Sequence, residues 1–191
     1  MTQDAKILFR WFILVLICSS IGVLIIFRDV KKGFGTITFG KFPEFNLTDQ
    51  FSNRINLEEL SKGPWIGNFI TKDCQKSEDC SELLRVNSSI QQKLNDYSNV
   101  QIVTFQNKNL SNEYLSILND FNSILTKWKL LSGDDEYINL LAERILNQNL
   151  PESKINELLF LVDQNGIIRG YYQVVNEFEI SKLIDDVKKL I

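Results

Sequence analysis

The sequence of 191 residues predicts an α/β domain in which helices cover a mixed sheet. Three observations support this class. Strand-like and helix-like patterns alternate from residue 42 to residue 191, no repeat or low-complexity run interrupts them, and a turn sequence near residue 163 separates two strand-like segments. Hydrophobic residues make up 44% of the chain, which is ample for a packed core in a domain of this length.

The expected elements follow the order strand, helix, strand, helices, hairpin and helix. Short apolar segments predict strands at residues 66–70 and 100–105. Apolar residues at helical spacing predict helices at residues 81–97, 112–121, 134–146 and from 177 to near the end of the chain. Residues 158–162 and 167–172 are expected to form an antiparallel hairpin across the turn at 163–166. This is the element order of the thioredoxin fold.

A long apolar run precedes this domain. Residues 11–27 carry no charge, and residues 7–9 extend the run past Arg10. As a helix rising about 1.5 Å per residue, residues 7–27 would reach roughly 31 Å, enough to cross a bilayer core. A cleaved signal peptide is the alternative, but no A-x-A-like site follows the run, and Ile17 stands where a lipoprotein signal needs a small residue before Cys18. We expect a tail at 1–6, a transmembrane anchor at 7–27, a tether at 28–41 and the thioredoxin-like domain at 42–191.

The charges exclude one class of partner but leave the orientation of the anchor open. Basic residues stand on both sides of the predicted span, so the positive-inside rule does not decide. Residues 1–32 hold five of the 21 basic and two of the 24 acidic residues, which leaves the rest of the chain at a formal charge of −6. An acidic domain argues against nucleic acid as a partner, because a basic stripe is the expected footprint. The expected partners are the membrane and a protein client.

The chain contains no histidine. This excludes Ser-His-Asp and Cys-His catalytic pairs and any imidazole-ligated metal site. The three cysteines, Cys18, Cys74 and Cys80, are therefore the main side chains for a soft-metal or thiol-based site. Cys18 lies inside the predicted anchor and is interpreted as a small apolar filler.

Cys74 and Cys80 fall between the strand at 66–70 and the helix at 81–97, where the thioredoxin fold carries its redox cysteines. The N-terminus of a helix stabilises a thiolate. The C-x5-C spacing is longer than C-x-x-C, and four carboxylates nearby, against two lysines, disfavour a thiolate. We expect an ordinary thiol pair, with a structural disulfide as the alternative. The charged neighbours are Asp73, Glu78, Asp79, Glu82, Lys72 and Lys76.

Four segments of the domain match motifs of one family in order and spacing. FPEFNLTD at 42–49 is similar to P-x-F-x-L-x-D, and GPWIGNFI at 63–70 to G-K-W-x-x-N-F-I. WKLLSG at 128–133 is similar to W-x-x-L-T-G, and FLVDQNG at 160–166 to Y-L-V-D-x-x-G. With these motifs the chain resembles the Sco/SenC proteins, which are membrane-anchored, thioredoxin-fold factors of cytochrome c oxidase copper-site assembly.

The resemblance implies that Cys74 and Cys80 form a redox pair and are the ligands of a copper site. Family members usually show C-P-x-x-C-P, whereas no proline follows either cysteine here. The copper-ligating histidine of the family is expected near Ile155 and is missing, and its acidic D-P-x-x-D stretch is replaced by NKNL at 107–110. Two thiolates alone suit Cu(I), a soft ion, and make a poor Cu(II) site.

Three hypotheses remain open. The first is a Sco-like factor on the outer face of a bacterial or mitochondrial inner membrane. It would act in cytochrome c oxidase assembly through the Cys74/Cys80 dithiol, by thiol–disulfide exchange, Cu(I) binding or both. The second is a general membrane-tethered thiol–disulfide oxidoreductase, which would be an enzyme. The third is a non-catalytic module that uses the thioredoxin-like fold for protein contacts and carries a structural disulfide. The order and spacing of the motifs favour the first.

Overall fold

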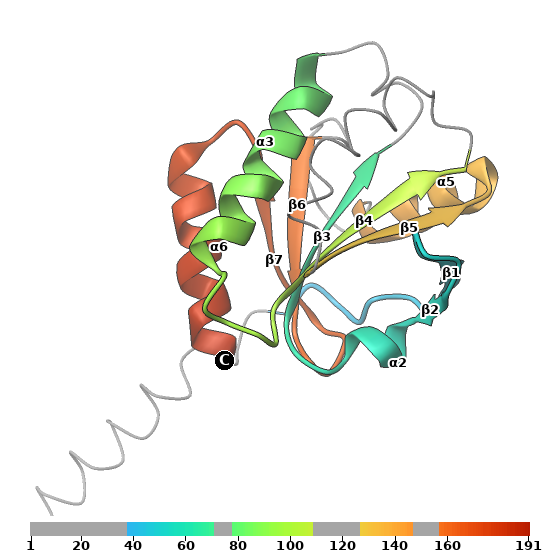
Figure 1. The fold of residues 1–191 in the computed structure, drawn as a ribbon, viewed down its shortest axis with the longest axis horizontal. Coiled ribbons are helices and arrows are strands. Elements are labelled where there is room, and N and C mark those ends of the chain that lie inside the picture. Colours follow the sequence, from blue (N-terminus) through green and yellow to red (C-terminus); the bar gives the residue numbers. More distant parts are fainter. Residues whose placement is uncertain (1–37, 71–77, 109–126, 147–156) are drawn as a thin grey trace, which may run out of the picture. The chain divides into compact units, whose positions relative to one another are not determined.

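The computed structural model describes residues 38–70, 78–108, 127–146 and 157–191. They belong to one compact unit, Thr38–Ile191, in which strands and helices alternate (Figure 1). The elements are β1 (Asn46–Thr48), β2 (Arg54–Asn56), α2 (Leu57–Leu60), β3 (Trp65–Ile70), α3 (Glu78–Lys93), β4 (Gln101–Asn107), β5 (Trp128–Gly133), α5 (Asp135–Leu146), β6 (Leu158–Val162), β7 (Ile168–Gln173) and α6 (Glu177–Leu190).

The described strands form one mixed sheet in the order β2-β1-β5-β4-β3-β6-β7. At its centre β3, β4 and β5 run parallel to one another. β6 runs antiparallel to β3, and β7 antiparallel to β6. β1 pairs antiparallel with β2 and, at the single position Thr48–Ser132, with β5. The predicted α/β class with a mixed sheet is confirmed.

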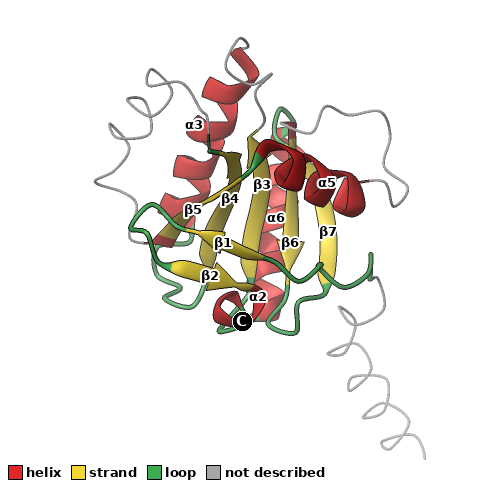
Figure 2. Ribbon diagram, turned by 90° about the vertical axis from the view of Figure 1, so that its right-hand side faces the viewer, coloured by secondary structure: helices red, strands yellow, loops and turns green. Residues whose placement is uncertain are grey.

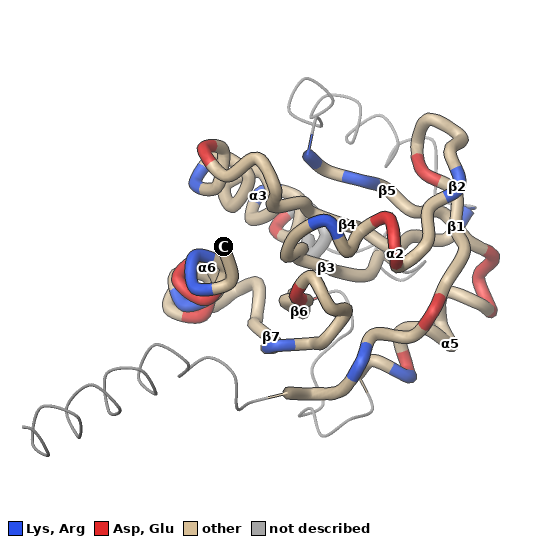
Figure 3. Tube along the Cα trace, turned by 90° about the horizontal axis from the view of Figure 1, so that it is seen from below, with Lys and Arg blue, Asp and Glu red and all other residues tan. Residues whose placement is uncertain are grey.

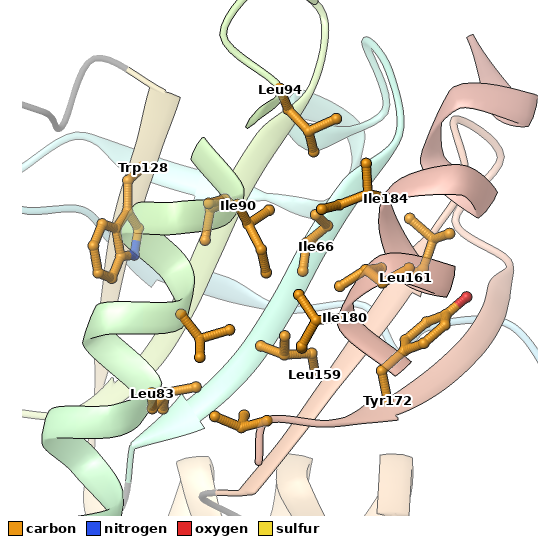
Figure 4. Packing of buried hydrophobic residues seen from close by; sticks show 14 of the residues in the cluster. Ile66, Leu83, Ile90, Leu94, Trp128, Leu159, Leu161, Tyr172, Ile180 and Ile184 are labelled. Carbon is orange, nitrogen blue, oxygen red and sulfur yellow. The ribbon is translucent and has the colours of Figure 1, made fainter. Parts of the chain in front are cut away.

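Helices cover both faces of this sheet (Figure 2). α3 and α6 pack on one face, where their apolar residues form a cluster with side chains of the sheet. Figure 4 shows this cluster, in which Ile66 and Leu159 of the sheet meet Ile90 of α3 and Ile180 of α6. α5 and α2 pack on the opposite face, in a second cluster that includes Phe69, Phe105 and Phe160 and the closely spaced rings of Phe42 and Trp65.

β3 is buried along its whole length. Ile66 and Ile70 join the cluster under α3 and α6, whereas Trp65 and Phe69 join the cluster on the opposite face. A strand that is covered on both faces has a continuous apolar sequence instead of an alternating one, as WIGNFI does. The predicted strand at 66–70 is therefore confirmed, and Trp65 is a fully buried core residue.

Several other elements match the sequence patterns. β6 spans the predicted residues, and β7 is shifted by one residue from its predicted span. In the turn between them, a carboxylate oxygen of Asp163 accepts the N–H groups of Asn165 and Ile167, at 2.8 and 3.0 Å, which confirms its role in the turn. α5 and α6 bury the predicted apolar stripes. The helix predicted at 112–121 lies outside the described residues.

Sequence patterns do not predict β1, β2, α2 or β5. The first three elements have only three or four residues each, too few for a periodic pattern. β5 is a short parallel strand whose residues Trp128, Leu130 and Leu131 are buried, and its register with β4 runs from Ile102–Trp128 to Asn107–Gly133. Its position beside β4 becomes visible only in the assembled sheet.

The packed unit begins at Thr38, before the predicted domain start at Phe42. The N–H of Phe39 donates to the carbonyl of Ile168 at 3.0 Å, and the N–H of Phe42 donates to the carbonyl of Gly166 at 2.8 Å. The ring of Phe39 lies edge-on to that of Tyr171, with centroids 5.2 Å apart. The end of the predicted tether thus extends the edge of the sheet along β7.

Asp186 is a buried carboxylate on the otherwise apolar inner face of α6. It accepts the hydroxyl of Tyr172 at 2.9 Å and pairs with Lys189 at 2.8 Å, so its charge is satisfied. Burial and this hydrogen bond raise the pKa of Tyr172. Along the outer side of α6, residues of both charges stand side by side (Figure 3).

Gly67 leaves room for a ring from a neighbouring strand, and its substitution tests the packing of β3. A Cβ atom at this position would overlap the ring of Phe160 and lie 2.9 Å from Trp65. We expect Gly67→Ala to lower the free energy of unfolding by about 1–3 kcal/mol, as overpacking does in other cores. Urea denaturation measures the change, with Ser89→Ala on α3 as the control. A loss below about 0.5 kcal/mol, within the range of ordinary surface changes, would show that the ring moves aside.

Candidate functional site

One edge of the sheet brings together the ends of its central strands. β3, β4 and β5 are parallel and end at this edge. β6 begins there, because its antiparallel register pairs Leu159 with Asn68 near the end of β3. α3 starts beside the same edge (Figure 1). We call it the carboxyl edge, defined by Ile70, Lys108, Gly133 and Leu158. In open α/β sheets, ligands bind outside the carboxyl ends of strands.

The two predicted site cysteines belong to the chain that leaves β3 at this edge. Cys74 lies outside the described residues, as does Cys18. Cys80 is the third residue of α3, which begins at Glu78 and not at Ser81 as predicted. The prediction that residue 80 precedes the helix is therefore wrong. Glu78 and Asp79 are the first two residues of α3.

Helical spacing places position 80 on the buried side of α3. Leu83, Leu84 and Asn87 are at most 1% exposed and face the sheet. Position 80 precedes them by three, four and seven residues, and these spacings share one face of an α-helix. The backbone of α3 therefore places position 80 on the stripe that faces β3, at the end of the helix nearest to the carboxyl edge.

Two residues after Cys80, Glu82 forms an ion pair with Arg85. Two nitrogens of the Arg85 guanidinium donate to the two carboxylate oxygens of Glu82, at 2.9 and 2.6 Å. The hydrogen bond from Arg85 holds the pKa of Glu82 below its ordinary value, and the same contact raises the pKa of Arg85. The pair is largely exposed, so its contribution to stability is small. The pair thus neutralises one of the four carboxylates that stand near Cys74 and Cys80 in the sequence.

The layer between α3 and the sheet contains polar side chains that the sequence analysis does not identify. Asn68 of β3 donates through Nδ2 to Oδ1 of Asn87 on α3, at 3.2 Å. On β4, Thr104 lies directly beside Asn68, and its hydroxyl oxygen accepts Nε1–H of Trp128 at 2.8 Å. Trp128 is 1% exposed and belongs to the core. The sequence feature that could have identified Asn68 is its position as a polar residue inside an otherwise apolar strand.

The Asn68–Asn87 pair is costly for stability. Both side chains are fully buried, and in the described part of the chain Oδ1 of Asn68 and Nδ2 of Asn87 have no hydrogen-bond partner. A hydrogen bond contributes about 0.5–1.5 kcal/mol net, whereas each unsatisfied buried polar group costs about 1–3 kcal/mol. One bond therefore does not offset two unsatisfied atoms.

Polar residues also stand where β4 and β5 reach the carboxyl edge. Asn107 is buried, and its neighbour Lys108 pairs with Asp134 at 3.0 Å between Nζ and Oδ1. Beside this ion pair is a shallow pocket of about 290 Å³, lined by Ser132, Tyr137 and others. Where the family's acidic stretch would follow β4, this chain therefore has the amide of Asn107 and the ammonium group of Lys108. Asp134 balances the charge of Lys108.

The described residues hold no ready-made metal site. No cluster of three or more His, Cys, Asp or Glu side chains that could hold a metal ion occurs among them. Ile155, the position near which the family's histidine is expected, lies outside the described residues. A soft metal ion at the carboxyl edge would therefore depend on the thiols of Cys74 and Cys80.

The predicted anchor at 7–27 also lies outside the described residues. Among the helices that the structure describes, none has both the length and the hydropathy needed to cross a membrane.

Sequence comparisons return no relative, whereas structural comparison does. No protein-family model and no curated protein sequence matches the chain. Solved structures match its fold, and Sco proteins recur among them. BsSco, a member of the Sco family of cytochrome c oxidase assembly proteins in which a disulfide switch was identified, superposes with a TM-score of 0.64 at 19% identity, covering 79% of this chain and 93% of BsSco.

Two further neighbours differ in what they bind or do. Yeast Sco1 with copper bound superposes with a TM-score of 0.58 at 14% identity, covering 80% of this chain and 95% of Sco1. A protein disulfide isomerase candidate from Bacteroides thetaiotaomicron has a TM-score of 0.58 at 16% identity, covering 81% of this chain and 89% of its own. At these identities the likeness establishes the fold: the described domain is thioredoxin-like, of the kind found in Sco proteins.

The Glu82–Arg85 ion pair, two residues beyond Cys80 in the sequence, predicts how this thiol responds to charge. In a Cys18→Ser, Cys74→Ser background, Arg85→Ala leaves the Glu82 carboxylate unpaired and should lower the thiolate fraction of Cys80, while Glu82→Gln should raise it. The rate of alkylation by iodoacetamide at pH 7 measures this fraction. Lys93→Ala, at the far end of α3, is the control and should change nothing. Equal rates in all variants would show that Cys80 does not sense this pair.

Proposed function

We propose that the chain is a Sco-like protein that acts in cytochrome c oxidase assembly through the Cys74/Cys80 dithiol. One observation carries the proposal: Cys80 occupies the first turn of α3, at the carboxyl edge, in a domain whose solved structural neighbours include several Sco proteins. Two of these neighbours bear on the chemistry, one by a disulfide switch and one by bound copper.

The redox step needs only the two cysteines and a thiol or disulfide partner. When Cys74 and Cys80 form a disulfide, their two thiols give up two electrons and two protons. A disulfide of the partner protein takes these up and becomes two thiols. The reverse reaction reduces the Cys74–Cys80 disulfide at the expense of two thiols of the partner. Attack proceeds through a thiolate, which the N-terminus of α3 favours.

Copper would be cargo at this site. The thiolates of Cys74 and Cys80 are soft ligands and fit Cu(I), for which two-coordinate binding is reasonable. Without any histidine in the chain, an imidazole-completed Cu(II) site cannot form. The proposal thus favours Cu(I), and a cycle in which disulfide formation releases the ion, since a disulfide provides no thiolate.

The anchor and the location are part of the same proposal. Residues 7–27 have the length and hydropathy of a transmembrane helix, followed by a tether from residue 28 to the packed unit. A domain on the outer face of a bacterial or mitochondrial inner membrane meets a compartment in which disulfides persist. A protein client such as an oxidase subunit is the partner we infer there.

A general thiol–disulfide oxidoreductase is the second candidate. The structural similarity to a protein disulfide isomerase candidate supports it, and the missing histidine removes a feature that copper delivery would use. A non-catalytic module with a structural disulfide is the third. The reduction potential separates these two, since structural disulfides lie below about −300 mV and reactive ones above.

Copper binding is tested on the reduced full chain in mild detergent. We expect one Cu(I) per chain in competition with a weak chelator, and loss of this binding in Cys74→Ser and in Cys80→Ser. Cys18→Ser is the matched control and should bind as the unsubstituted chain does. Failure of the unsubstituted chain to compete for Cu(I) would remove the copper function and leave the redox function.

The redox function is tested separately by equilibration with glutathione and trapping of free thiols. We expect a Cys74–Cys80 disulfide that exchanges with a potential above about −300 mV. A lower potential would support the structural disulfide. Full complementation of a deletion strain by the Cys74→Ser, Cys80→Ser double variant would leave only the non-catalytic module.

A further inference from the structure

The hairpin at one end of the sheet is joined to it by few backbone contacts. It consists of β1, the turn at residues 49–53 and β2, and we call residues 46–56 the edge hairpin. In the described part of the chain β1 pairs with β5 only at Thr48–Ser132, whereas β4 pairs with β5 along its whole length. The backbone groups of β5 before Ser132 therefore need other partners on the side that faces the hairpin.

The side chain of Gln50 supplies these partners. Its Nε2 donates to the carbonyl of Trp128, and its Oε1 accepts the N–H of Leu130, both at 3.0 Å. Trp128, Leu130 and Ser132 are alternate residues of β5, so their backbone groups face the same side of the strand. A residue of a neighbouring parallel strand makes the same two bonds, to one carbonyl and to the N–H two residues further on. The Gln50 amide thus stands in for one residue of a strand.

A turn with several internal hydrogen bonds presents Gln50 to β5. The Asp49 carboxylate, only 8% exposed, accepts the N–H groups of Phe51 and Asn53 at 2.9 and 2.8 Å and the side-chain amide of Asn53 at 3.0 Å. Burial raises the pKa of Asp49, but the hydrogen bonds from Asn53 and Phe51 and the charge of Lys129 outweigh this effect and hold the pKa below its ordinary value. The turn therefore keeps its charge and its hydrogen bonds in mildly acidic solution.

The edge hairpin buries only two large apolar side chains, Leu47 and Ile55, which join the cluster around Phe105. Phe51, in its turn, is 70% exposed. A single two-stranded hairpin is at best marginally stable in water, so the ladder between β1 and β2 does not persist once it leaves the sheet. An opening of the edge hairpin would therefore expose its backbone amides to solvent as a group.

We propose that the Gln50 side chain holds the edge hairpin against β5 in place of strand pairing, and that the hairpin opens as a unit while the rest of the domain stays folded. All three residues of β1 line the pocket of about 290 Å³ at the carboxyl edge. Opening removes this wall of the pocket and frees the Trp128 carbonyl and the Leu130 N–H. Gln50 is a positioning residue in this device, which does not depend on the cysteines or on the redox function.

Hydrogen exchange of the full chain in mild detergent, followed by mass spectrometry, measures the opening. In the unsubstituted chain we expect the amides of residues 46–56 to exchange roughly tenfold or more faster than those of β3 and β4, with a weaker dependence on urea. A local opening exposes less surface than global unfolding does. Exchange at the same rate and with the same urea dependence would show that the hairpin unfolds only together with the domain, and would overturn the proposal.

Gln50→Ala removes both hydrogen bonds to β5 and leaves the Asp49 turn and the Thr48–Ser132 pairing in place. We expect it to accelerate the exchange of residues 46–56 by roughly tenfold or more, because two hydrogen bonds of the closed state are lost. Exchange within twofold of the unsubstituted chain would show that Gln50 does not hold the hairpin.

Tyr172→Phe is the matched control. It removes the hydroxyl that donates to Asp186, on β7 at the opposite end of the sheet. We expect this variant to lower the urea midpoint and to leave the exchange of residues 46–56 unchanged. An equal acceleration in this control would assign the effect of Gln50→Ala to general destabilisation and overturn the proposal.

Gln50→Glu tests the hydrogen bonds apart from the size of the side chain. At pH 7 the introduced carboxylate accepts the Leu130 N–H but cannot donate to the Trp128 carbonyl, so exchange should be accelerated. At pH 4, close to the ordinary pKa of a glutamic acid of about 4.3, the protonated carboxyl group donates and accepts as the amide does. The acceleration relative to the unsubstituted chain should then shrink by roughly threefold or more.

Gln50→Ala is the reference for this pH comparison. Its charged sequence neighbours, Asp49 and Lys129, are the same as in Gln50→Glu, and it carries no group that titrates at position 50. We expect its acceleration to be equal at pH 4 and pH 7. The same pH response in both variants, or none in Gln50→Glu, would show that donation to the Trp128 carbonyl does not hold the hairpin, which contradicts the proposal.

Discussion

The burial of β3 between two layers of helices determines the arrangement of the rest of the domain. Its parallel pairing with β4 and antiparallel pairing with β6 place it inside the sheet, and all six of its residues are buried. Because both faces are apolar, α3 and α6 must cover one and α5 and α2 the other. The parallel direction of β3, β4 and β5 then brings their carboxyl ends to one edge.

The candidate site follows from this constraint. The chain that leaves β3 returns as α3, which must pack on β3 again, so the first turn of α3 and Cys80 stand at the carboxyl edge. The layer that holds α3 in place is apolar apart from a few buried polar contacts, of which the Asn68–Asn87 bond joins β3 to α3. Packing brings the helix to the sheet, and a buried hydrogen bond joins the two elements.

In the function proposed above, the chemistry at this edge is that of the Cys74 and Cys80 thiols. The chain has no histidine, and where the family pattern has carboxylates after the second strand, this chain has Asn107 and Lys108, the latter paired with Asp134. A hard or imidazole-bound metal ion finds no suitable ligand set among the described residues. Thiol–disulfide exchange and Cu(I) binding both remain consistent with two cysteines, and both depend on the distance between them.

The sequence by itself determined the elements whose patterns are local: the apolar run of β3, the stripes of α5 and α6, and the hairpin with the Asp163 turn. It also excluded imidazole as a ligand, because the chain contains no histidine. Only the tertiary structure decided that residues 128–133 form a strand beside β4, that α3 begins before Cys80, and that Asn68 meets Asn87. The physical reason is that short strands, helix starts and buried polar contacts draw their stability from residues distant in the chain, whose pairing no local periodicity encodes.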